Sequence, residues 1–285
     1  MKNVIVPNPK KFEGLKNQIL KDESKKFHVL ADFDRTLTKC FVNGKFIPSI
    51  ISILRNENYL SEEYSEKAKA LANYYRPIEF NNKISIKQKK KAMREWWTIH
   101  FNLFIESGLN KKNLERVINE GNVQFREGAE EFLDLLYQKK IPLIIISSSG
   151  IGDLIPMYLK KYKRLYSNIH IITNLYKWDK NGKSIGIPKP VIHSFNKDET
   201  MVKDFPNIYK EIKNRKNVLL LGDSIGDLGM ITGFNYKNLI KIGFLNENIE
   251  KDLEIYKKKF EVIITYDYNM NYVNNLIKEI KWKSQ

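Results

Sequence analysis

The sequence of 285 residues lacks the features that mark disulfide-bonded, membrane-spanning or secreted proteins. It has one cysteine, Cys40, so an internal disulfide is excluded and a reducing compartment is expected. No apolar run approaches the roughly 20 residues of a membrane-spanning helix. Residues 1–10 lack the apolar core of a secretory signal. We therefore expect no membrane partner and a cytoplasmic location.

Acidic residues are also scarce: 33 stand against 49 lysines and arginines, for a formal net charge of +16. Lysine is spread along the whole chain, whereas a nucleic-acid groove typically interleaves arginine and aromatic residues on one element. The densest run, residues 87–91, begins a predicted helix and is most simply a solvated face. We therefore expect no stable nucleic-acid partner. A lysine-rich surface without a role of its own is the simpler interpretation, and steering of anionic substrates toward the site is the alternative. A non-catalytic nucleic-acid binder stays as the alternative from another class, and it predicts salt-sensitive binding that persists in Asp32→Asn.

Two acidic motifs are present, and each follows a short apolar run. Residues 32–36 (DFDRT) follow residues 28–31, and residues 222–227 (GDSIGD) follow residues 218–221. Such runs predict buried parallel strands, and ligands bind at the carboxyl ends of these strands. Clustered carboxylates repel one another unless a cation joins them, and Mg²⁺ is the natural candidate. We expect four carboxylates to converge on such a site: Asp32, Asp34, Asp223 and Asp227.

The alternation of strands and helices predicts an α/β fold with a doubly wound parallel sheet. Predicted strands cover residues 28–31, 143–147, 169–173, 218–222, 239–243 and 262–265. Predicted helices cover residues 61–75, 85–107, 111–120, 151–162 and 269–282. The first three helices interrupt the alternation, so we expect a helical cap domain at 47–121, inserted into a core of residues 1–46 and 122–285. Such an insertion can act as a lid over the acidic cluster.

The two aspartates of the first motif can take different roles in one reaction. Asp32 can attack an electrophile while Asp34 transfers protons. A carboxylate is a suitable nucleophile toward a phosphoryl group whose charge is neutralised by Mg²⁺ and a lysine. An isolated Asp-x-Asp is more often a turn or a cap, so the interpretation depends on the motifs that follow.

Four motifs occur in an order and spacing that resemble the haloacid dehalogenase superfamily of aspartyl-phosphate enzymes. They are residues 32–36, the serine-rich strand end 147–150 (SSSG), Lys197 within FNKD, and residues 222–227. The resemblance implies a Rossmann-type core with a helical cap after the first strand.

Further segments narrow the resemblance to the cytosolic pyrimidine 5′-nucleotidases, the cytosolic 5′-nucleotidase III family, over residues 10–280. These segments are 148–153 (SSGIGD), 193–197 (HSFNK), 220–228 (LLGDSIGDL) and 241–246 (KIGFLN). The resemblance implies a monomeric, Mg²⁺-dependent phosphoric monoester hydrolase. Its expected reaction converts nucleoside 5′-monophosphates, CMP or UMP first, to nucleoside and phosphate.

The same resemblance implies roles for the core residues. Asp32 is the expected nucleophile, Asp34 the general acid and base, and Lys197 the cation on the phosphoryl group. Ser148 and the Ser149 backbone amide are expected to bind phosphate oxygens at a helix start. The expected metal ligands are the Asp32 carboxylate, the Asp34 backbone carbonyl and Asp223, with Asp227 binding directly or through another ligand.

Base recognition is expected from the cap. The segment 74–79 (YYRPIE) implies that Glu79 contacts the base, and Trp96 is a candidate for stacking on it. His100 occupies a position where the family has a substrate-facing serine, so it is expected to touch the ligand. The second motif also departs from the family's Ser-Ala-Gly, with Ser149 in the middle position.

Three other activities would use the same core. A phosphatase for another small phosphomonoester, such as phosphoserine, would be indifferent to Glu79→Gln. A preference for 7-methyl-GMP would rest on a cationic base stacked on Trp96 and paired with Glu79. The covalent intermediate could also pass its phosphoryl group to another nucleoside.

Overall fold

The computed structural model describes residues 3–56, 59–81, 83–121, 123–187, 189–197, 205–232 and 235–280. Across these ranges, no helix combines the length and the apolar character needed to cross a membrane.

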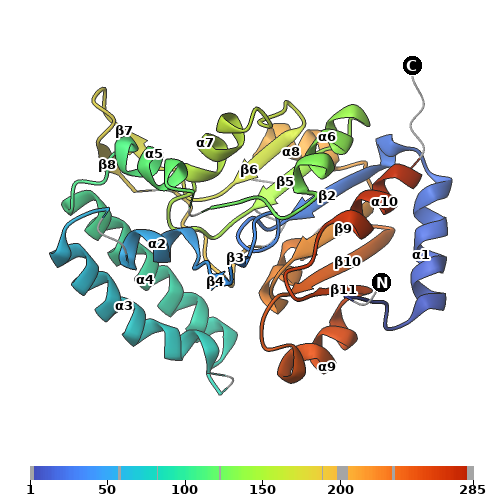
Figure 1. Ribbon diagram of the computed structural model, residues 1–285, viewed down its shortest axis with the longest axis horizontal. Coiled ribbons are helices and arrows are strands. Elements are labelled where there is room, and N and C mark those ends of the chain that lie inside the picture. The colour runs from blue at the N-terminus through green and yellow to red at the C-terminus, as the bar shows by residue number, and fades with distance from the viewer. Residues whose placement is uncertain are drawn as a thin grey trace.

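A seven-stranded sheet forms the centre of the molecule, in the order β1-β11-β10-β9-β2-β5-β6 (Figure 1). Neighbouring strands are parallel except β1, which pairs antiparallel with β11. All six predicted strands are present, and the doubly wound α/β class is confirmed. The strands are β1 Val4–Ile5, β2 Phe27–Ala31, β5 Leu143–Ile146, β6 Ile169–Ile172, β9 Asn217–Gly222, β10 Asn238–Leu245 and β11 Val262–Thr265.

Helices cover both faces of this sheet because alternate strand residues point to opposite sides. Val29 belongs to the larger core cluster, and its neighbour Leu30 to a smaller one. The larger cluster includes residues of α1 Pro9–Lys21, α6 Ala129–Gln138, α7 Leu154–Lys161 and α10 Asn271–Glu279. The smaller clusters lie under α8 Pro206–Ile212 and α9 Ile249–Lys259. The closing helix ends at Glu279, short of the predicted residue 282, which lies outside the described residues.

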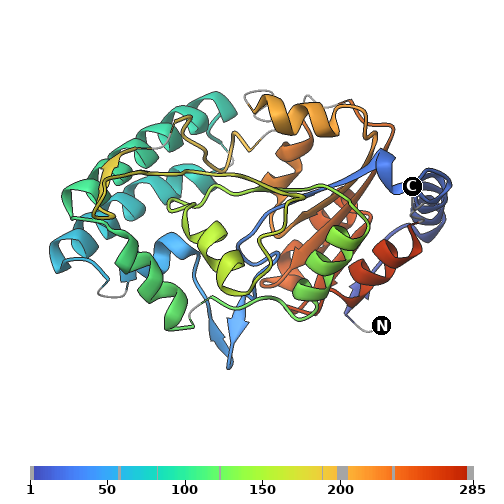
Figure 2. The same ribbon diagram turned by 90° about the horizontal axis from the view of Figure 1, so that it is seen from above.

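Between β2 and β5 the chain forms a hairpin and a group of helices beside the sheet (Figures 1 and 2). The hairpin joins β3 Phe41–Val42 and β4 Lys45–Phe46. The helices are α2 Ile50–Asn56, α3 Glu62–Phe80, α4 Ile86–Glu106 and α5 Lys111–Asn119. Ser85 and Gln88 form a capping box at the start of α4, in agreement with the helix predicted from residue 85.

Helix α3 ends five residues later than predicted, at Phe80. It continues through Pro77, which normally breaks a helix because its nitrogen carries no hydrogen. Packing against α4 compensates locally, through a cluster that includes Tyr75, Ile78 and Trp96. The last turn of α3 therefore presents Arg76 and Glu79 as helical residues.

A second hairpin reaches the helical group from the later part of the chain. Strands β7 Lys177–Trp178 and β8 Ser184–Gly186 lie beside α5 in Figure 1. The Ser184 amide donates to the Leu109 carbonyl at 2.9 Å, and the Lys111 amide donates to the Gly182 carbonyl at 2.9 Å. Residues 177–186, which the sequence places in the core segment, therefore also support the helical group.

Candidate active site

The two acidic motifs come together at the carboxyl ends of β2 and β9, which are adjacent and parallel. The Asp32 amide donates to the carbonyl of Leu221 at 3.0 Å, which fixes the first motif beside the second. Carboxylate oxygens of Asp32, Asp223 and Asp227 all lie within 4.8 Å of one another. The sheet order therefore joins groups about 190 residues apart in sequence.

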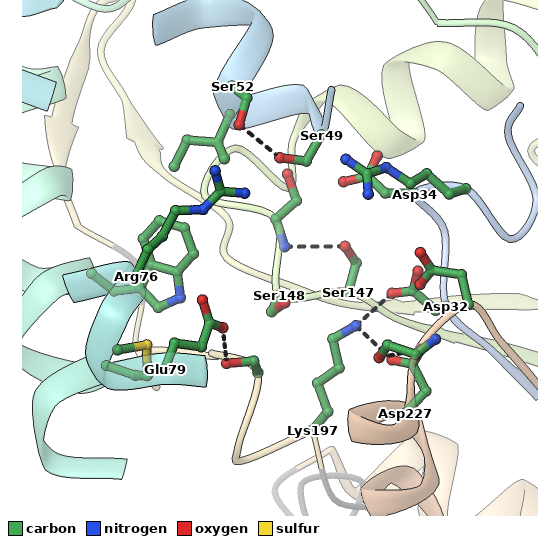
Figure 3. A pocket seen from close by; sticks show the side chains of 18 of the residues that line it. Asp32, Asp34, Ser49, Ser52, Arg76, Glu79, Ser147, Ser148, Lys197 and Asp227 are labelled. Carbon is green, nitrogen blue, oxygen red and sulfur yellow. Dashed lines mark hydrogen bonds and ion pairs between the residues drawn. The ribbon is translucent and has the colours of Figure 1, made fainter. Parts of the chain in front are cut away.

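A cavity of about 260 Å³ opens over this cluster (Figure 3). The sheet side contributes the acidic residues, the serine-rich loop and Lys197. The helical side contributes side chains from α2, α3, α4 and the segment before α2. These helical residues include Ser49, Ser52, Arg55, Arg76, Glu79 and Trp96.

Lys197 bridges two of the carboxylates. Its Nζ lies 2.5 Å from Asp32 Oδ1 and 3.0 Å from Asp227 Oδ1, and all three side chains are buried. Burial raises the pKa of Asp32 to about 7, although the Lys197 charge acts in the opposite direction. Burial would lower the pKa of Lys197, but the charges of Asp227 and Asp32 outweigh it and raise this pKa. The lysine is therefore a fixed cation beside Asp32.

Asp227 is held at both of its oxygens. Oδ1 accepts from Lys197, and Oδ2 accepts from the backbone amide and the hydroxyl of Ser224, both at 2.9 Å. Gly222 makes room for it, because a Cβ at that position would lie 2.5 Å from the Asp227 Cβ. This set of donors fixes the carboxylate next to Lys197.

Asp34 follows the nucleophile position and lines the same cavity. Burial raises the pKa of its carboxyl group to about 6, against the nearby charges of Arg35 and Lys197 and a hydrogen bond from the Ile50 backbone amide. Ile50 is the first residue of α2. A proton on Asp34 is therefore accessible near neutral pH, at the boundary between sheet and helices.

The serine-rich loop differs in one respect from the expectation. All three serines, Ser147 to Ser149, line the cavity. The Ser149 amide, however, donates to the Ser147 hydroxyl at 3.1 Å, and α7 begins only at Leu154. The amide therefore points along a turn that precedes the helix, and not from the helix start itself.

Glu79 lies on the helical side of the cavity and is held by two elements. Its Oε1 accepts the hydroxyl of Ser194 at 2.7 Å, and its backbone carbonyl accepts Lys89 Nζ at 2.7 Å. Lys89 is buried, so the expectation that residues 87–91 form a solvated face is wrong at this position. The buried lysine supports the last turn of α3 because it replaces a missing backbone donor there.

Trp96 also lines the cavity, but its ring is already engaged. It stacks on Tyr75, with centroids 5.6 Å apart, and on Trp97, with centroids 5.3 Å apart. Its indole Nε1 is buried and has no acceptor among the residues that the structure describes. Trp96 therefore offers the cavity an unused hydrogen-bond donor more readily than a free ring face.

His100 does not line the cavity, which corrects the expectation that it touches the ligand. It is fully buried among the helices, and its Nε2 lies 3.0 Å from the Tyr64 hydroxyl. Burial lowers the pKa of His100 to about 3. The neutral imidazole of His100 is paired with the Tyr64 phenol in the interior of the helical group. On α4, His100 therefore faces α3 and not the cavity.

Several cavity residues were not expected from the sequence, among them Ser49, Ser52 and the two arginines Arg55 and Arg76. Arg76 lies inside the segment quoted for Glu79, so its position three residues earlier on one helix was a usable signal. Arg55 had no such signal, because only the packing of α2 brings it to the cavity.

Arg126 was also not expected from the sequence, and it holds the backbone of Arg35 and Thr36 in the first acidic motif. This buried guanidinium donates to the carbonyl of Thr36 at 2.8 Å, to the carbonyl of Arg35 and to Asn246 Oδ1 at 3.0 Å. It forms an ion pair of 3.0 Å with Asp267. Its partners come from segments far apart in sequence, so no local pattern marks it.

The acidic cluster fits a hard divalent cation. Burial, Asp227 and Asp32 raise the pKa of Asp223 well above its ordinary value, so three nearby carboxylates are costly to ionise together without added positive charge. The donors are carboxylate oxygens, which Mg²⁺ prefers. Asp32 and Asp223 are the residues that would hold it, with Asp227 beside them.

Comparisons with known proteins agree with this site. The family described as pyrimidine 5′-nucleotidase (UMPH-1) matches residues 35–281. The chain belongs to this family. The 7-methylguanosine phosphate-specific 5′-nucleotidase A of Xenopus laevis is 34% identical over 276 residues, which cover 95% of this chain and 94% of the relative. The human 7-methylguanosine phosphate-specific 5′-nucleotidase is 34% identical over 97% of this chain and 92% of its own.

Solved structures support the same assignment. Cytosolic 5′-nucleotidase IIIB bound to cytidine superposes with a TM-score of 0.88 at 27% identity, covering 98% of this chain and 94% of that one. A substrate-bound phosphoserine phosphatase superposes with a TM-score of 0.52 at 18% identity, covering 91% and 100% of the two chains, and shows the shared fold alone. The chain is a phosphoric monoester hydrolase of the 5′-nucleotidase type with the haloacid dehalogenase fold.

Proposed function

We propose that this protein is a Mg²⁺-dependent 5′-nucleotidase that prefers pyrimidine nucleoside 5′-monophosphates, with CMP first. One observation carries the proposal: a single cavity joins Asp32 and Lys197 at one end to Glu79 at the other. The first pair suits a phosphoryl group, and the carboxylate of Glu79 suits an amino group on a base.

The proposed reaction has two displacements at phosphorus. A carboxylate oxygen of Asp32 attacks the 5′-phosphate, and the bond from phosphorus to the ribose 5′-oxygen breaks. Asp34 gives its proton to that oxygen, and the nucleoside leaves. Asp34 then takes a proton from water, whose oxygen attacks the aspartyl-phosphate and releases phosphate and the Asp32 carboxylate.

The remaining residues stabilise charge. Lys197 neutralises the phosphoryl oxygens and Asp32, and the hydroxyl of Ser148 and the loop amides bind phosphate oxygens. Mg²⁺ held by Asp32, the Asp34 carbonyl and Asp223 would supply further positive charge and orientation. Asp227 fixes Lys197, since both of its oxygens already accept hydrogen bonds.

A neutral base fits the helical side of the cavity best. Cytosine has an amino donor for Glu79 and ring acceptors for the unused Trp96 N–H. Arg55 and Arg76 line the same cavity, and their charges oppose a cationic base such as 7-methylguanine. Trp96 is also stacked on protein rings, which weakens the case for cation–π binding on it.

7-Methyl-GMP is the second candidate because relatives at 34% identity are named for it. Glu79 would then pair with the ring N–H and amino group of the base. The two candidates share the phosphate site and differ only in what the helical side accepts.

We also infer that residues 47–121 act as the cap that selects the substrate. Ser52, Glu79 and Trp96 come from this segment, whereas Asp32 and Lys197 come from the core. A monomeric enzyme in the cytoplasm is part of the same proposal.

The test is phosphate release with Mg²⁺ from CMP, UMP, AMP, GMP, 7-methyl-GMP and phosphoserine. We expect CMP to have the highest kcat/KM, and Asp32→Asn to abolish turnover. Glu79→Gln should lower kcat/KM for CMP roughly tenfold or more, the effect of one charge-assisted hydrogen bond. Glu66→Gln, an exposed change on the same helix, is the matched control. Preference for phosphoserine, or indifference to Glu79→Gln, would refute the proposed base contact.

A further inference from the structure

Two arginines form a cationic wall of the cavity that the proposed monophosphate reaction does not use. Arg55, from α2, and Arg76, from the last turn of α3, both line the cavity. Arg55 is 8% exposed, and its Nη2 donates to the Ser52 hydroxyl at 2.9 Å. That hydroxyl lies 3.1 Å from the hydroxyl of Ser49. The wall therefore combines two guanidinium groups with two hydroxyls.

Among the described residues, no carboxylate forms an ion pair with Arg55 or Arg76, although Asp34 and Glu79 line the same cavity. By contrast, Arg35 in the same cavity lies 3.7 Å from Glu247, and the buried Arg126 lies 3.0 Å from Asp267. Glu79 lies three residues after Arg76, but its Oε1 accepts the hydroxyl of Ser194 instead. Burial lowers the pKa of Arg55, and the charge of Arg76 lowers it further. The two cations therefore act on each other without an anion between them.

Such an arrangement is costly in the absence of a ligand. A buried charge that lacks a counter-charge destabilises the fold, and Arg55 is such a charge, whereas Arg76 is exposed to solvent. Guanidinium groups match phosphate oxygens in bidentate geometry, and serine hydroxyls add further donors. A dianionic phosphate would satisfy both arginines and both serines.

The position of the wall indicates where on a nucleotide this phosphate would lie. In Figure 3, Asp32 and Lys197 lie at one end and Glu79 at the other, while Arg76, Ser49 and Ser52 lie to one side of the line between them. A nucleotide with its 5′-phosphate at Asp32 and its base at Glu79 places its ribose between these ends. The 2′ and 3′ oxygens are the ribose positions that project sideways.

We propose that Arg55 and Arg76 bind a second phosphate on the ribose, so that the substrate class includes nucleoside 2′,5′- or 3′,5′-bisphosphates. This inference rests on the proposed function for the orientation of the nucleotide. The bond that breaks is unchanged: the 5′-phosphate is transferred to Asp32 and then to water, and the product is a nucleoside 2′- or 3′-phosphate.

The experiment compares kcat/KM for cytidine 3′,5′-bisphosphate, cytidine 2′,5′-bisphosphate, CDP and CMP. In the wild-type enzyme we expect one bisphosphate to exceed CMP roughly tenfold, the effect of one charge-assisted contact. Arg76→Gln should bring this ratio close to one, and Arg55→Lys should lower it while keeping the buried charge. Arg94→Gln, at an exposed position on α4 outside the cavity lining, is the matched control and should keep the wild-type ratio.

A binding measurement separates this inference from the proposed function. In Asp32→Asn, which cannot react, titration calorimetry compares the affinities of the bisphosphates, CMP and inorganic phosphate. Tighter binding of a bisphosphate, lost in the double variant with Arg76→Gln, supports the second site even if no nucleotide is hydrolysed. Turnover of CMP with a bisphosphate ratio near one, or a ratio that Arg76→Gln leaves unchanged, overturns it. A preference for CDP over both bisphosphates also overturns it, because that phosphate would lie in line and not at the ribose.

Discussion

Lys197 Nζ lies 2.5 Å from Asp32 Oδ1, in a buried contact between residues 165 positions apart. The same ammonium group reaches Asp227 at 3.0 Å, so one cation serves two carboxylates. The contact places a permanent positive charge where a phosphoryl group would accept the Asp32 oxygen.

Replacing this lysine should therefore affect both activity and stability. Lys197→Met should lower kcat by roughly 100-fold or more, the usual cost of losing one preorganised charge-stabilising donor. It should also destabilise the fold without Mg²⁺ by about 3–5 kcal/mol, because two buried carboxylates lose their counter-charge. Urea unfolding and phosphate release would measure these effects. Lys112→Met, at an exposed position, is the control, and equal effects of the two changes would contradict the assignment.

Metal binding should be visible in stability as well as in activity. Chelation should abolish phosphate release, and Mg²⁺ at 100 times its dissociation constant should stabilise the wild-type fold by about 2.7 kcal/mol. Asp223→Asn should remove this stabilisation because the carboxylate cluster loses a ligand. Thermal unfolding with and without Mg²⁺ makes the comparison, with the exposed change Glu254→Gln as control. A Mg²⁺ effect that survives Asp223→Asn would place the ion elsewhere.

His100 should make the fold sensitive to acid. Its pKa is about 3 in the folded protein, below the ordinary value of 6.5, so the unfolded chain binds the proton more readily. The stabilisation is fully present above pH 6.5 and is lost as the pH falls from 6.5 toward 3. Between pH 7.5 and 5 this one group should cost about 2 kcal/mol of unfolding free energy.

Denaturant unfolding at the two pH values tests this. His100→Gln removes the titrating group, so its unfolding free energy should fall by about 2 kcal/mol less than that of the wild type over this range. His28 and His193 are unchanged in both proteins, so their contributions cancel. Asn102→Ala, an exposed change on α4, should keep the wild-type difference. Identical pH dependence in His100→Gln and the wild type would show that this imidazole is accessible to water.

Gly222 should tolerate no side chain. A Cβ there would lie 2.5 Å from the Asp227 Cβ and 2.7 Å from its Oδ2, so Gly222→Ala must displace that carboxylate from Lys197. We expect a loss of about 1–3 kcal/mol of stability, typical of overpacking, together with reduced kcat. Gly229→Ala is the matched control, because a Cβ at Gly229 meets nothing within 4 Å. Full activity in Gly222→Ala would show that the Asp227 position is not critical.

Local sequence patterns were sufficient for the six parallel strands, though not for the short antiparallel β1, and for the acidic end of the cavity. Apolar runs bounded by glycine and aspartate predicted the parallel strands because burial on both faces leaves no polar alternation. They also placed Asp32 and Asp223 at strand ends, where sheet order brings them together. The helix predicted from residue 85 agrees with α4, whose start is capped by Ser85 and Gln88.

Patterns failed where a side chain's surroundings come from distant segments. His100 was expected at the ligand from its position in a motif, but the packing of α3 against α4 turned it toward Tyr64. Lys89 looked like part of a solvated run, yet it reaches the Glu79 carbonyl. Helix α3 ran past Pro77 because tertiary contacts outweighed the local preference.

The sequence by itself determined the strand ends, the acidic motifs and the family, because these depend on residue types at short spacing. Tertiary structure alone decided which charges are paired. It paired Lys197 with Asp32 and Asp227, and it placed the Ser194 hydroxyl as a donor to Glu79. It left Arg55 and Arg76 at the cavity without an ion-pair partner among the described residues. The reason is physical: electrostatic and hydrogen-bond partners are set by distances of a few ångströms between elements, and those distances exist only in the folded chain.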